Sequence, residues 1–236
     1  MSAVRSRIAG LVAEFGLPEG SARQLRAILD TVEHDPMAPT TVLDPAWGVE
    51  AHVADSLDGL RVPAVREARS IADVGPGAGF PGLVLAVALP HAQVRLVESV
   101  GRKCDFIRRA VAAAQLTNVR VMHARAEDWP EGIERHDVVT ARAVAPLPVL
   151  VEYAAPLLAL DGRLVAWKGL RDPGEEADGR AAAAATGLEH VETVAVPSRP
   201  GAEHRQLHVY AKVSLTPARF PRRPGMARKR PISASG

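Results

Sequence analysis

The feature that most constrains this chain is a glycine-rich turn, Asp-Val-Gly-Pro-Gly-Ala-Gly-Phe-Pro-Gly, at residues 73–82. It follows a short apolar run at 71–74 and leads into a predicted helix near 80–89. Glycines allow a tight turn with positive φ and let a ligand come close to the backbone, and the free N–H groups at a helix start favour negative charge. This arrangement is typical of nucleotide-binding α/β domains of several classes.

Short apolar runs and longer helical patterns alternate from residue 70 onward. This alternation predicts parallel strands with helices on both faces of the sheet. The last two predicted strands are separated only by a loop, which favours an antiparallel hairpin at one edge. We therefore expect an α/β, Rossmann-like, mostly parallel seven-stranded sheet, with strands at 71–74, 94–97, 119–122, 137–140, 164–167, 191–196 and 206–213 and helices near 80–89, 102–115, 147–159 and 174–186.

The 236 residues fit one domain, which we divide into three parts. Residues 1–60 form an N-terminal helical cap and loop, with two amphipathic helices within 1–34, a proline-rich stretch at 35–48 and a short helix at 49–60. Residues 70–213 form the Rossmann-like core. Residues 217–236 form a basic tail.

Composition and charge restrict the setting in which the chain works. Charged residues interrupt every apolar run well before the roughly 20 residues that a membrane span requires. We therefore expect a protein that does not bind membranes. The lone Cys104 cannot form an internal disulfide, which fits the reducing cytoplasm. We also expect a monomer. The net charge is +2, yet the tail alone carries six basic residues and no acid. This asymmetry leaves two interpretations open, an anionic partner such as a phosphate backbone or a solvated end.

Two acidic positions extend the predicted ligand site beyond the glycine turn. Glu98 ends the second predicted strand, 25 residues after Asp73, where a carboxylate can accept both hydroxyls of a ribose. Residues 125–129, Arg-Ala-Glu-Asp-Trp, follow the third strand, where open α/β sheets also bind ligands. Adenine recognition fits that position, whereas Trp129 is better interpreted as a packing residue.

Several motifs occur together in an order that resembles one family. They are the turn at 73–82, Arg102-Lys103, residues 123–127 (His-Ala-Arg-Ala-Glu), and residues 140–145 (Thr-Ala-Arg-Ala-Val-Ala). Residues 52–57, Lys168 and the tail motif at 220–225 (Phe-Pro-Arg-Arg-Pro-Gly) with Lys229 and Pro231 add to them. This set closely resembles the ribosomal RNA small subunit methyltransferase G family, also called the glucose-inhibited division protein B family.

The resemblance implies S-adenosylmethionine as the cofactor and methyl transfer to N7 of a guanine in the decoding-region loop of 16S ribosomal RNA. It implies cofactor contacts at Gly75, Phe80, Ala126, Glu127 and Arg142. The residue-level interpretation adds Gly77, Gly79 and Glu98. Charge inside an apolar strand-to-helix junction also predicts a carboxylate or cofactor partner for Arg142.

Guanine N7 carries an available lone pair, so its methylation requires no general base. We therefore assign no catalytic residue and no metal. Arg125 and Lys168 are candidates for positioning the substrate. Cys104 is interpreted as structural, and residues 140–146 lack the Asn/Asp-Pro-Pro-aromatic signature of exocyclic amino methylation.

Aromatic residues make up only 4% of the chain, so RNA recognition should depend on phosphate contacts and shape. The partner is expected to be 16S ribosomal RNA or the small ribosomal subunit. Spacing before the last strand leaves either Arg199 or Arg205 as the RNA-facing residue. Removal of residues 217–236 is expected to weaken RNA binding and to leave cofactor binding intact. The candidate RNA contacts are Arg102, Lys103, Arg199, Arg222, Arg223 and Lys229.

Two other functions share part of this pattern. A nicotinamide-dependent oxidoreductase has the same glycine turn and strand-end acid. A non-catalytic ribosome assembly factor that kept the nucleotide pocket has all of the motifs. Binding of NAD without S-adenosylmethionine distinguishes the first, and absence of methyl transfer distinguishes the second.

Overall fold

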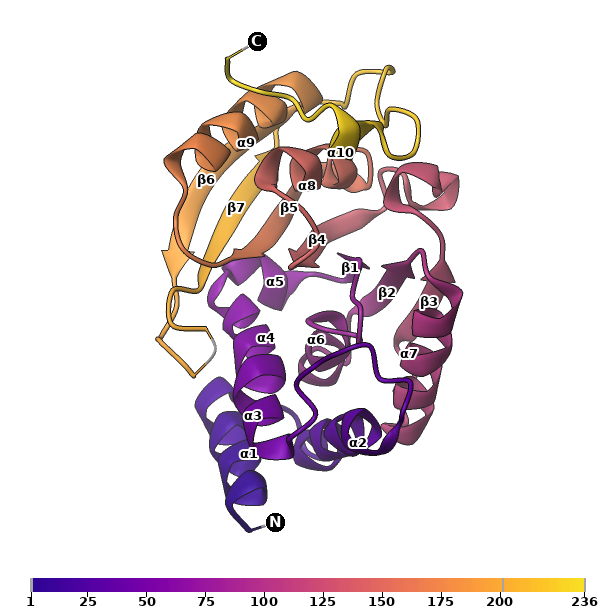
Figure 1. Cartoon of the computed structure of the whole chain (residues 1–236), viewed down its shortest axis with the longest axis vertical. Helices are drawn as coiled ribbons and strands as arrows, with labels where there is room; N and C mark the ends of the chain where they lie inside the picture. Colours follow the sequence, from indigo (N-terminus) through magenta and orange to yellow (C-terminus); the bar gives the residue numbers. More distant parts are fainter. Residues whose placement is uncertain (1, 201, 236) are drawn as a thin grey trace.

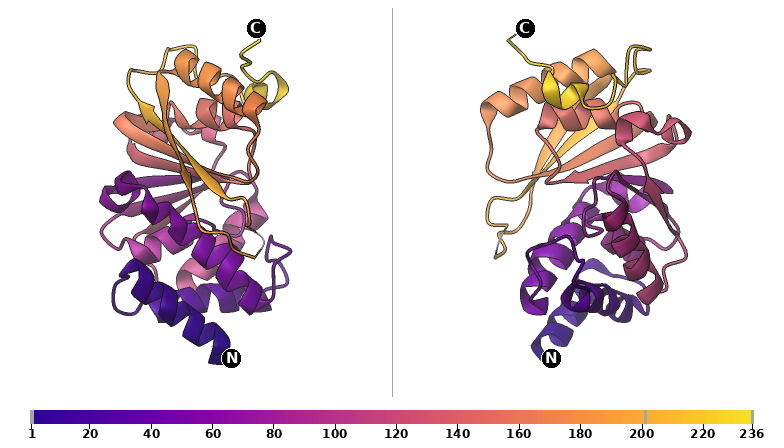
Figure 2. Two further views of the ribbon diagram at one scale, coloured as in Figure 1. Left: turned by 90° about the vertical axis from the view of Figure 1, so that its left-hand side faces the viewer. Right: turned by 45° about the vertical axis from the view of Figure 1, so that its right-hand side comes forward.

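The computed structural model describes residues 2–200 and 202–235 and places one mixed sheet between two layers of helices (Figures 1 and 2). The strand order is β3-β2-β1-β4-β5-β7-β6. The strands are β1 (Ser70–Val74), β2 (Gln93–Glu98), β3 (Val119–His123), β4 (His136–Arg142), β5 (Leu158–Lys168), β6 (Leu188–Ala195) and β7 (Gln206–Lys212).

Neighbouring strands from β3 to β5 pair in parallel, and β7 pairs antiparallel with both β5 and β6. This confirms the predicted α/β fold and its antiparallel hairpin, with β7 inserted beside β5 and β6 at the edge. An all-parallel dinucleotide-binding sheet has the order 3-2-1-4-5-6, so the inserted β7 sets this sheet apart from that of a nicotinamide-dependent oxidoreductase.

The first helical layer contains the N-terminal segments and the two helices that follow β1 and β2. Its apolar side chains share one core with the sheet, and α2 contributes Leu25, Ile28, Leu29 and Val32 at helical spacing. The elements are α1 (Ser2–Phe15), α2 (Ser21–His34), α3 (Pro45–Gly48), the π-helical turn η1 (Val49–Ala54), α4 (Asp55–Leu57), the 3₁₀ turn η2 (Asp58–Arg61), α5 (Pro63–Glu67), α6 (Gly82–Ala88) and α7 (Gly101–Ala113).

The second layer covers the opposite face of the sheet and has its own apolar core. It contains the 3₁₀ turns η3 (Ala126–Asp128) and η4 (Pro130–Gly132) and the helices α8 (Leu147–Ala154), α9 (Pro173–Thr186) and α10 (Met226–Lys229). Asp172 caps α9 by accepting hydrogen bonds from the Gly174 and Glu175 N–H groups, and Gly187 ends it with φ +86°.

Two expectations about local structure need correction, and one interpretation that the sequence left open is excluded. The helix predicted at 147–159 stops at Ala154, because Leu157 and Leu158 pair with β4 residues and β5 runs from Leu158 rather than from residue 164. Residues 49–60 are not one α-helix but successive π, α and 3₁₀ turns. The tail does not form a separate solvated end, since Ala227 is buried and α10 lies against α8. No helix within the described residues is long and apolar enough to cross a membrane.

Candidate functional site

The glycine turn leaves β1 at the carboxyl edge of the sheet and is fixed by Asp73. One carboxylate oxygen of Asp73 accepts the Gly82 N–H at 2.7 Å, and the other accepts the Thr140 hydroxyl at 3.0 Å. Burial raises the pKa of Asp73 to about 7, although both hydrogen bonds favour the carboxylate. A Cβ at position 82 would lie 2.1 Å from the Leu96 side chain, so only glycine fits there.

Glu98 lies beside this turn, as predicted. Its register partner in β3 is His123, and its carboxylate accepts the Gly77 N–H at 3.3 Å and the Val100 N–H at 2.9 Å. Each oxygen keeps a further lone pair for a ligand hydroxyl. Gly77 has φ +60° and open space where a Cβ would stand, so a ligand can approach the backbone at this point.

A cavity of about 190 Å³ lies next to this turn and contains several predicted cofactor residues. Gly75, Ala126 and Glu127 line it together with Arg125, one of the two predicted positioning residues. Its volume is below the roughly 300–1,000 Å³ of typical ligand pockets. The other lining residues are Val74, Val97, Ser99, Ala124, Val144, Tyr153 and Arg228.

Phe80 and Arg142 belong to a buried cluster beside the turn. The Phe80 ring stacks on the His52 ring with centroids 4.4 Å apart. The Arg142 guanidinium also lies over the Phe80 ring, 5.6 Å from its centroid. Arg142 donates to the Asp55 carboxylate at 2.5 Å and to the Ala51 carbonyl at 3.0 Å. The predicted carboxylate partner of Arg142 is therefore Asp55, which the sequence did not single out.

Asp55 also accepts a hydrogen bond from Arg205 at 2.7 Å, and its backbone carbonyl accepts the Trp167 indole N–H at 2.8 Å. Since Asp55, Arg142 and Arg205 come from distant parts of the sequence, spacing alone could not bring them together. The only signal was the need of a buried charge for a partner. Burial lowers the pKa of the neighbouring His52 to about 4, so its imidazole is neutral at pH 7.

Arg199 does not reach the surface, in contrast to its predicted RNA-facing position. Its side chain is 7% exposed, and its guanidinium donates to the Asp58 carboxylate at 3.0 and 3.1 Å. Because Arg205 is held by Asp55, both candidates for that position are engaged within the protein. Arg222 is likewise paired with the buried Glu152.

The remaining predicted RNA contacts are more accessible. Arg102, Arg223 and Lys229 are exposed and Lys103 is half-buried, and the positioning candidate Arg125 is exposed as well. None of these five side chains has an acidic partner within 4 Å among the described residues. Arg102 and Lys103 begin α7, just beyond Glu98. Lys168 ends β5 and pairs with Glu175 at 2.6 Å, which ties this predicted positioning residue to α9.

Cys104 and Trp129 behave as packing residues, as predicted. The Cys104 thiol is buried and donates to the Glu98 carbonyl at 3.3 Å, and burial raises its pKa, which opposes a thiolate nucleophile. Trp129 is 5% exposed and stacks on His136.

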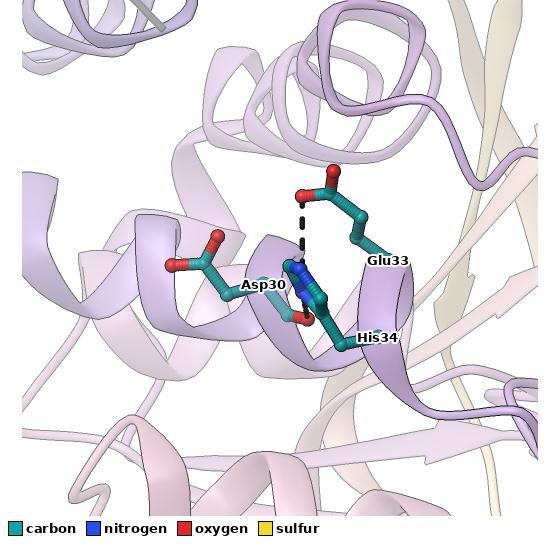
Figure 3. Close-up of side chains that lie close together, drawn as sticks. All are labelled: Asp30, Glu33 and His34. Carbon is teal, nitrogen blue, oxygen red and sulfur yellow. Dashed lines mark hydrogen bonds and ion pairs between the residues drawn. The ribbon is translucent and has the colours of Figure 1, made fainter.

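Two further features lie apart from the glycine turn. A larger cavity, about 460 Å³, lies between α1 and α2. None of the residues that line it also lines the cavity beside the glycine turn. Asp30, Glu33 and His34 come together on α2 (Figure 3), but both carboxylates already pair with Arg26, at 2.5 and 3.6 Å. These acids therefore have a cationic partner within the protein.

Comparisons with known proteins agree with this geometry. The family model described as rRNA small subunit methyltransferase G matches residues 40–207. A protein of that name from Chloroflexus aggregans is 40% identical over 92% of this chain and 94% of its own length. Its counterpart from Roseiflexus castenholzii is 44% identical over 82% of this chain and 83% of its own.

Solved structures support the fold assignment. A predicted O-methyltransferase from Agrobacterium tumefaciens superimposes with a TM-score of 0.53 at 27% identity, covering 70% of this chain and 81% of that one. A SAM-dependent methyltransferase from Aquifex aeolicus gives a TM-score of 0.56 at 20% identity, covering 72% and 94%. With a family model matching most of its length and relatives this similar, the chain belongs to the rRNA small subunit methyltransferase G family.

Proposed function

We propose that this protein is an S-adenosylmethionine-dependent methyltransferase that modifies N7 of a guanine in the decoding-region loop of 16S ribosomal RNA. The observation that carries the proposal is a cavity at the carboxyl edge of the sheet that Gly75 of the glycine turn, Ala126 and Glu127 line together. Glu98 lies beside the same turn, where its carboxylate accepts the Gly77 N–H. Family membership supplies the reaction and substrate class that this geometry serves.

The residues present suit S-adenosylmethionine. Glu98 offers two carboxylate oxygens to ribose hydroxyls, the cavity by Ala126 and Glu127 suits a flat nucleobase, and the open backbone at Gly77 suits the amino-acid end. When bound, this cofactor supplies an electrophilic methyl group on a sulfonium. The role of the protein is then to hold the cofactor and the guanine in line and to exclude water.

Positioning can supply most of the catalysis, because a guanine N7 lone pair needs no proton removed before it attacks. Good alignment of reacting atoms is worth about 7–11 kcal/mol. Arg125 borders the cavity and is exposed, so it is placed to grip a phosphate or the guanine O6 edge. Lys168 is less free to do so, since Glu175 holds its ammonium group.

Basic side chains without an acidic partner among the described residues define the RNA surface that we propose. Arg102, Lys103 and Arg125 follow strand ends, and Arg223 and Lys229 lie on the tail. We leave Arg199 out of this surface because Asp58 neutralises it inside the protein. A substrate reached through phosphate contacts should be folded RNA or the small subunit. We therefore propose that the protein acts in the cytoplasm, where it would meet the ribosomes.

The test is transfer of radiolabelled methyl from S-adenosylmethionine to small subunits that lack their native methylations, followed by mapping of the modified base. Labelled N7-methylguanosine in 16S ribosomal RNA is the expected result. Cofactor binding without transfer would instead indicate an assembly factor. Binding of NAD with no binding of S-adenosylmethionine would indicate an oxidoreductase.

A further inference from the structure

The C-terminal segment, residues 217–231, folds back over the second helical layer instead of projecting from it (Figure 1). Ala227 of α10 is 3% exposed and belongs to the core beneath α8. Arg222 anchors the segment through two hydrogen bonds to the buried Glu152 carboxylate, at 2.7 and 2.5 Å. A segment held by a buried ion pair and an apolar contact has a defined position on the protein.

Two hydrogen bonds join this segment to the walls of the candidate cofactor cavity. The Gly225 N–H donates to Glu127 Oε1 at 2.9 Å, and the Arg228 guanidinium donates to the Val144 carbonyl at 2.9 Å. Glu127 and Val144 both line the cavity, and Arg228 lines it as well. The tail thus supplies part of the wall, on the side where Tyr153 of α8 also lies.

The contact with Glu127 depends on the backbone conformation at Gly225. This residue precedes α10 with φ +84°, a conformation that side chains with a Cβ rarely adopt. Its N–H occupies one oxygen of Glu127 and so fixes the carboxylate, leaving Oε2 for a ligand donor. The orientation of a predicted cofactor residue is therefore set by the tail.

We infer that the C-terminal segment is the outer wall of the cofactor pocket, with Arg228 contacting the adenosine part of S-adenosylmethionine. This inference rests on the proposed function, since it takes that cofactor to occupy the cavity. A guanidinium is planar, stacks on flat rings and presents several N–H donors, which suits a nucleobase and its ring nitrogens. Arg228 reaches the cavity from the most basic part of the chain. One segment would therefore contact both the cofactor and the RNA.

A consequence is that cofactor and tail stabilise each other, since coupling between two binding events is reciprocal. Removal of residues 217–236 should then weaken the binding of both cofactor and RNA. This replaces the expectation from charge alone, in which truncation left cofactor binding intact.

The test compares Arg228→Ala with a matched control, Arg230→Ala, in the full-length protein. Both substitutions remove one exposed arginine from the same segment, but only the side chain of Arg228 lines the cavity. Calorimetric titration with S-adenosylmethionine should give a dissociation constant about tenfold higher for Arg228→Ala and within twofold of the parent for Arg230→Ala. Circular dichroism checks that both variants are folded.

Hydrogen exchange supplies a second measurement that does not depend on catalysis. Amides at 220–230 should become more protected when S-adenosylmethionine is added to the parent protein. Unchanged affinity in Arg228→Ala, or unchanged exchange at 220–230, would overturn the inference while the proposed function stands. No binding of S-adenosylmethionine to the parent protein would instead overturn both.

Discussion

Replacing Asp55 by asparagine removes the carboxylate that pairs with both Arg142 and Arg205. The Asp55 side chain is 1% exposed, and its two oxygens lie 2.5 Å from Arg142 Nη1 and 2.7 Å from Arg205 Nε. Asparagine keeps nearly the same size and shape, so the change isolates the charge. Arg142, 11% exposed, would then remain buried without its counterion.

Breaking a buried ion pair by removing one partner costs about 3–5 kcal/mol. Arg142 keeps the Ala51 carbonyl as a hydrogen-bond acceptor, so we expect the lower end, about 3 kcal/mol. For a protein of this length, that loss corresponds to a fall in Tm of roughly 6–12 °C. Arg205→Gln should cost less, about 1 kcal/mol, because Arg205 is more exposed and Asp55 keeps Arg142.

Urea unfolding at pH 7 measures these free energies, and a double-mutant cycle measures their coupling. Arg205→Gln should cost much less in the Asp55→Asn background than in the parent, because its partner charge is already gone. A loss below about 1 kcal/mol for Asp55→Asn, or strictly additive costs in the cycle, would refute this account of the buried charges.

Three other predictions follow from the site. Burial lowers the pKa of His136 to about 4, below its usual 6.5, so the unfolded chain protonates first and stability falls as pH drops from 7 toward 4. That contribution amounts to about 2 kcal/mol at pH 5, and His136→Asn should remove it from the pH dependence of urea unfolding. Glu98→Gln should weaken the binding of S-adenosylmethionine about tenfold in calorimetry, because a carboxylate is the stronger acceptor for ribose hydroxyls. It should also lower the Tm, because its amide NH2 would face one of the two backbone N–H groups that the Glu98 carboxylate accepts. Arg102→Ala with Lys103→Ala should reduce the slope of log affinity for RNA against log salt by roughly 1 to 2, which filter binding can measure; an unchanged slope would remove both from the RNA surface.

The sheet, its helices and the ligand edge could be predicted because each depends on local sequence. The alternation of apolar runs with helical patterns predicts which segments are strands and which are helices. The turn at 73–82 predicts the edge at which a parallel sheet binds ligands. The end of α8 was misplaced because Leu157 and Leu158 are as apolar as the helix before them. Pairing with His136 makes Leu158 the first residue of β5, and Leu157 lies in the turn before it. Periodicity cannot distinguish such short apolar runs.

The positions of the arginines could not be predicted from charge. Arg199 is basic and follows a strand, yet its buried guanidinium donates two hydrogen bonds to Asp58, far earlier in the chain. The tail was likewise interpreted from six basic side chains, while its contacts depend on Ala227 and on the backbone of Gly225. In both cases a distant partner decides the outcome, and one sequence does not show such pairs.

The insertion of β7 beside β5 affects the order in which the sheet can form during protein synthesis. Among the described strands, β6 pairs with β7 alone, and β7 is synthesised after it. Strand β6 therefore has no place in the sheet until residues 206–212 have been made. Until then β5 is the edge strand of the nascent sheet, and the backbone groups on its outer side are unpaired. At a synthesis rate of roughly 5–20 residues per second, this state lasts a few seconds. Open edges of this kind invite pairing with other chains. Mutations that slow the docking of β7 should therefore lower soluble yield more than they lower the stability of the finished protein.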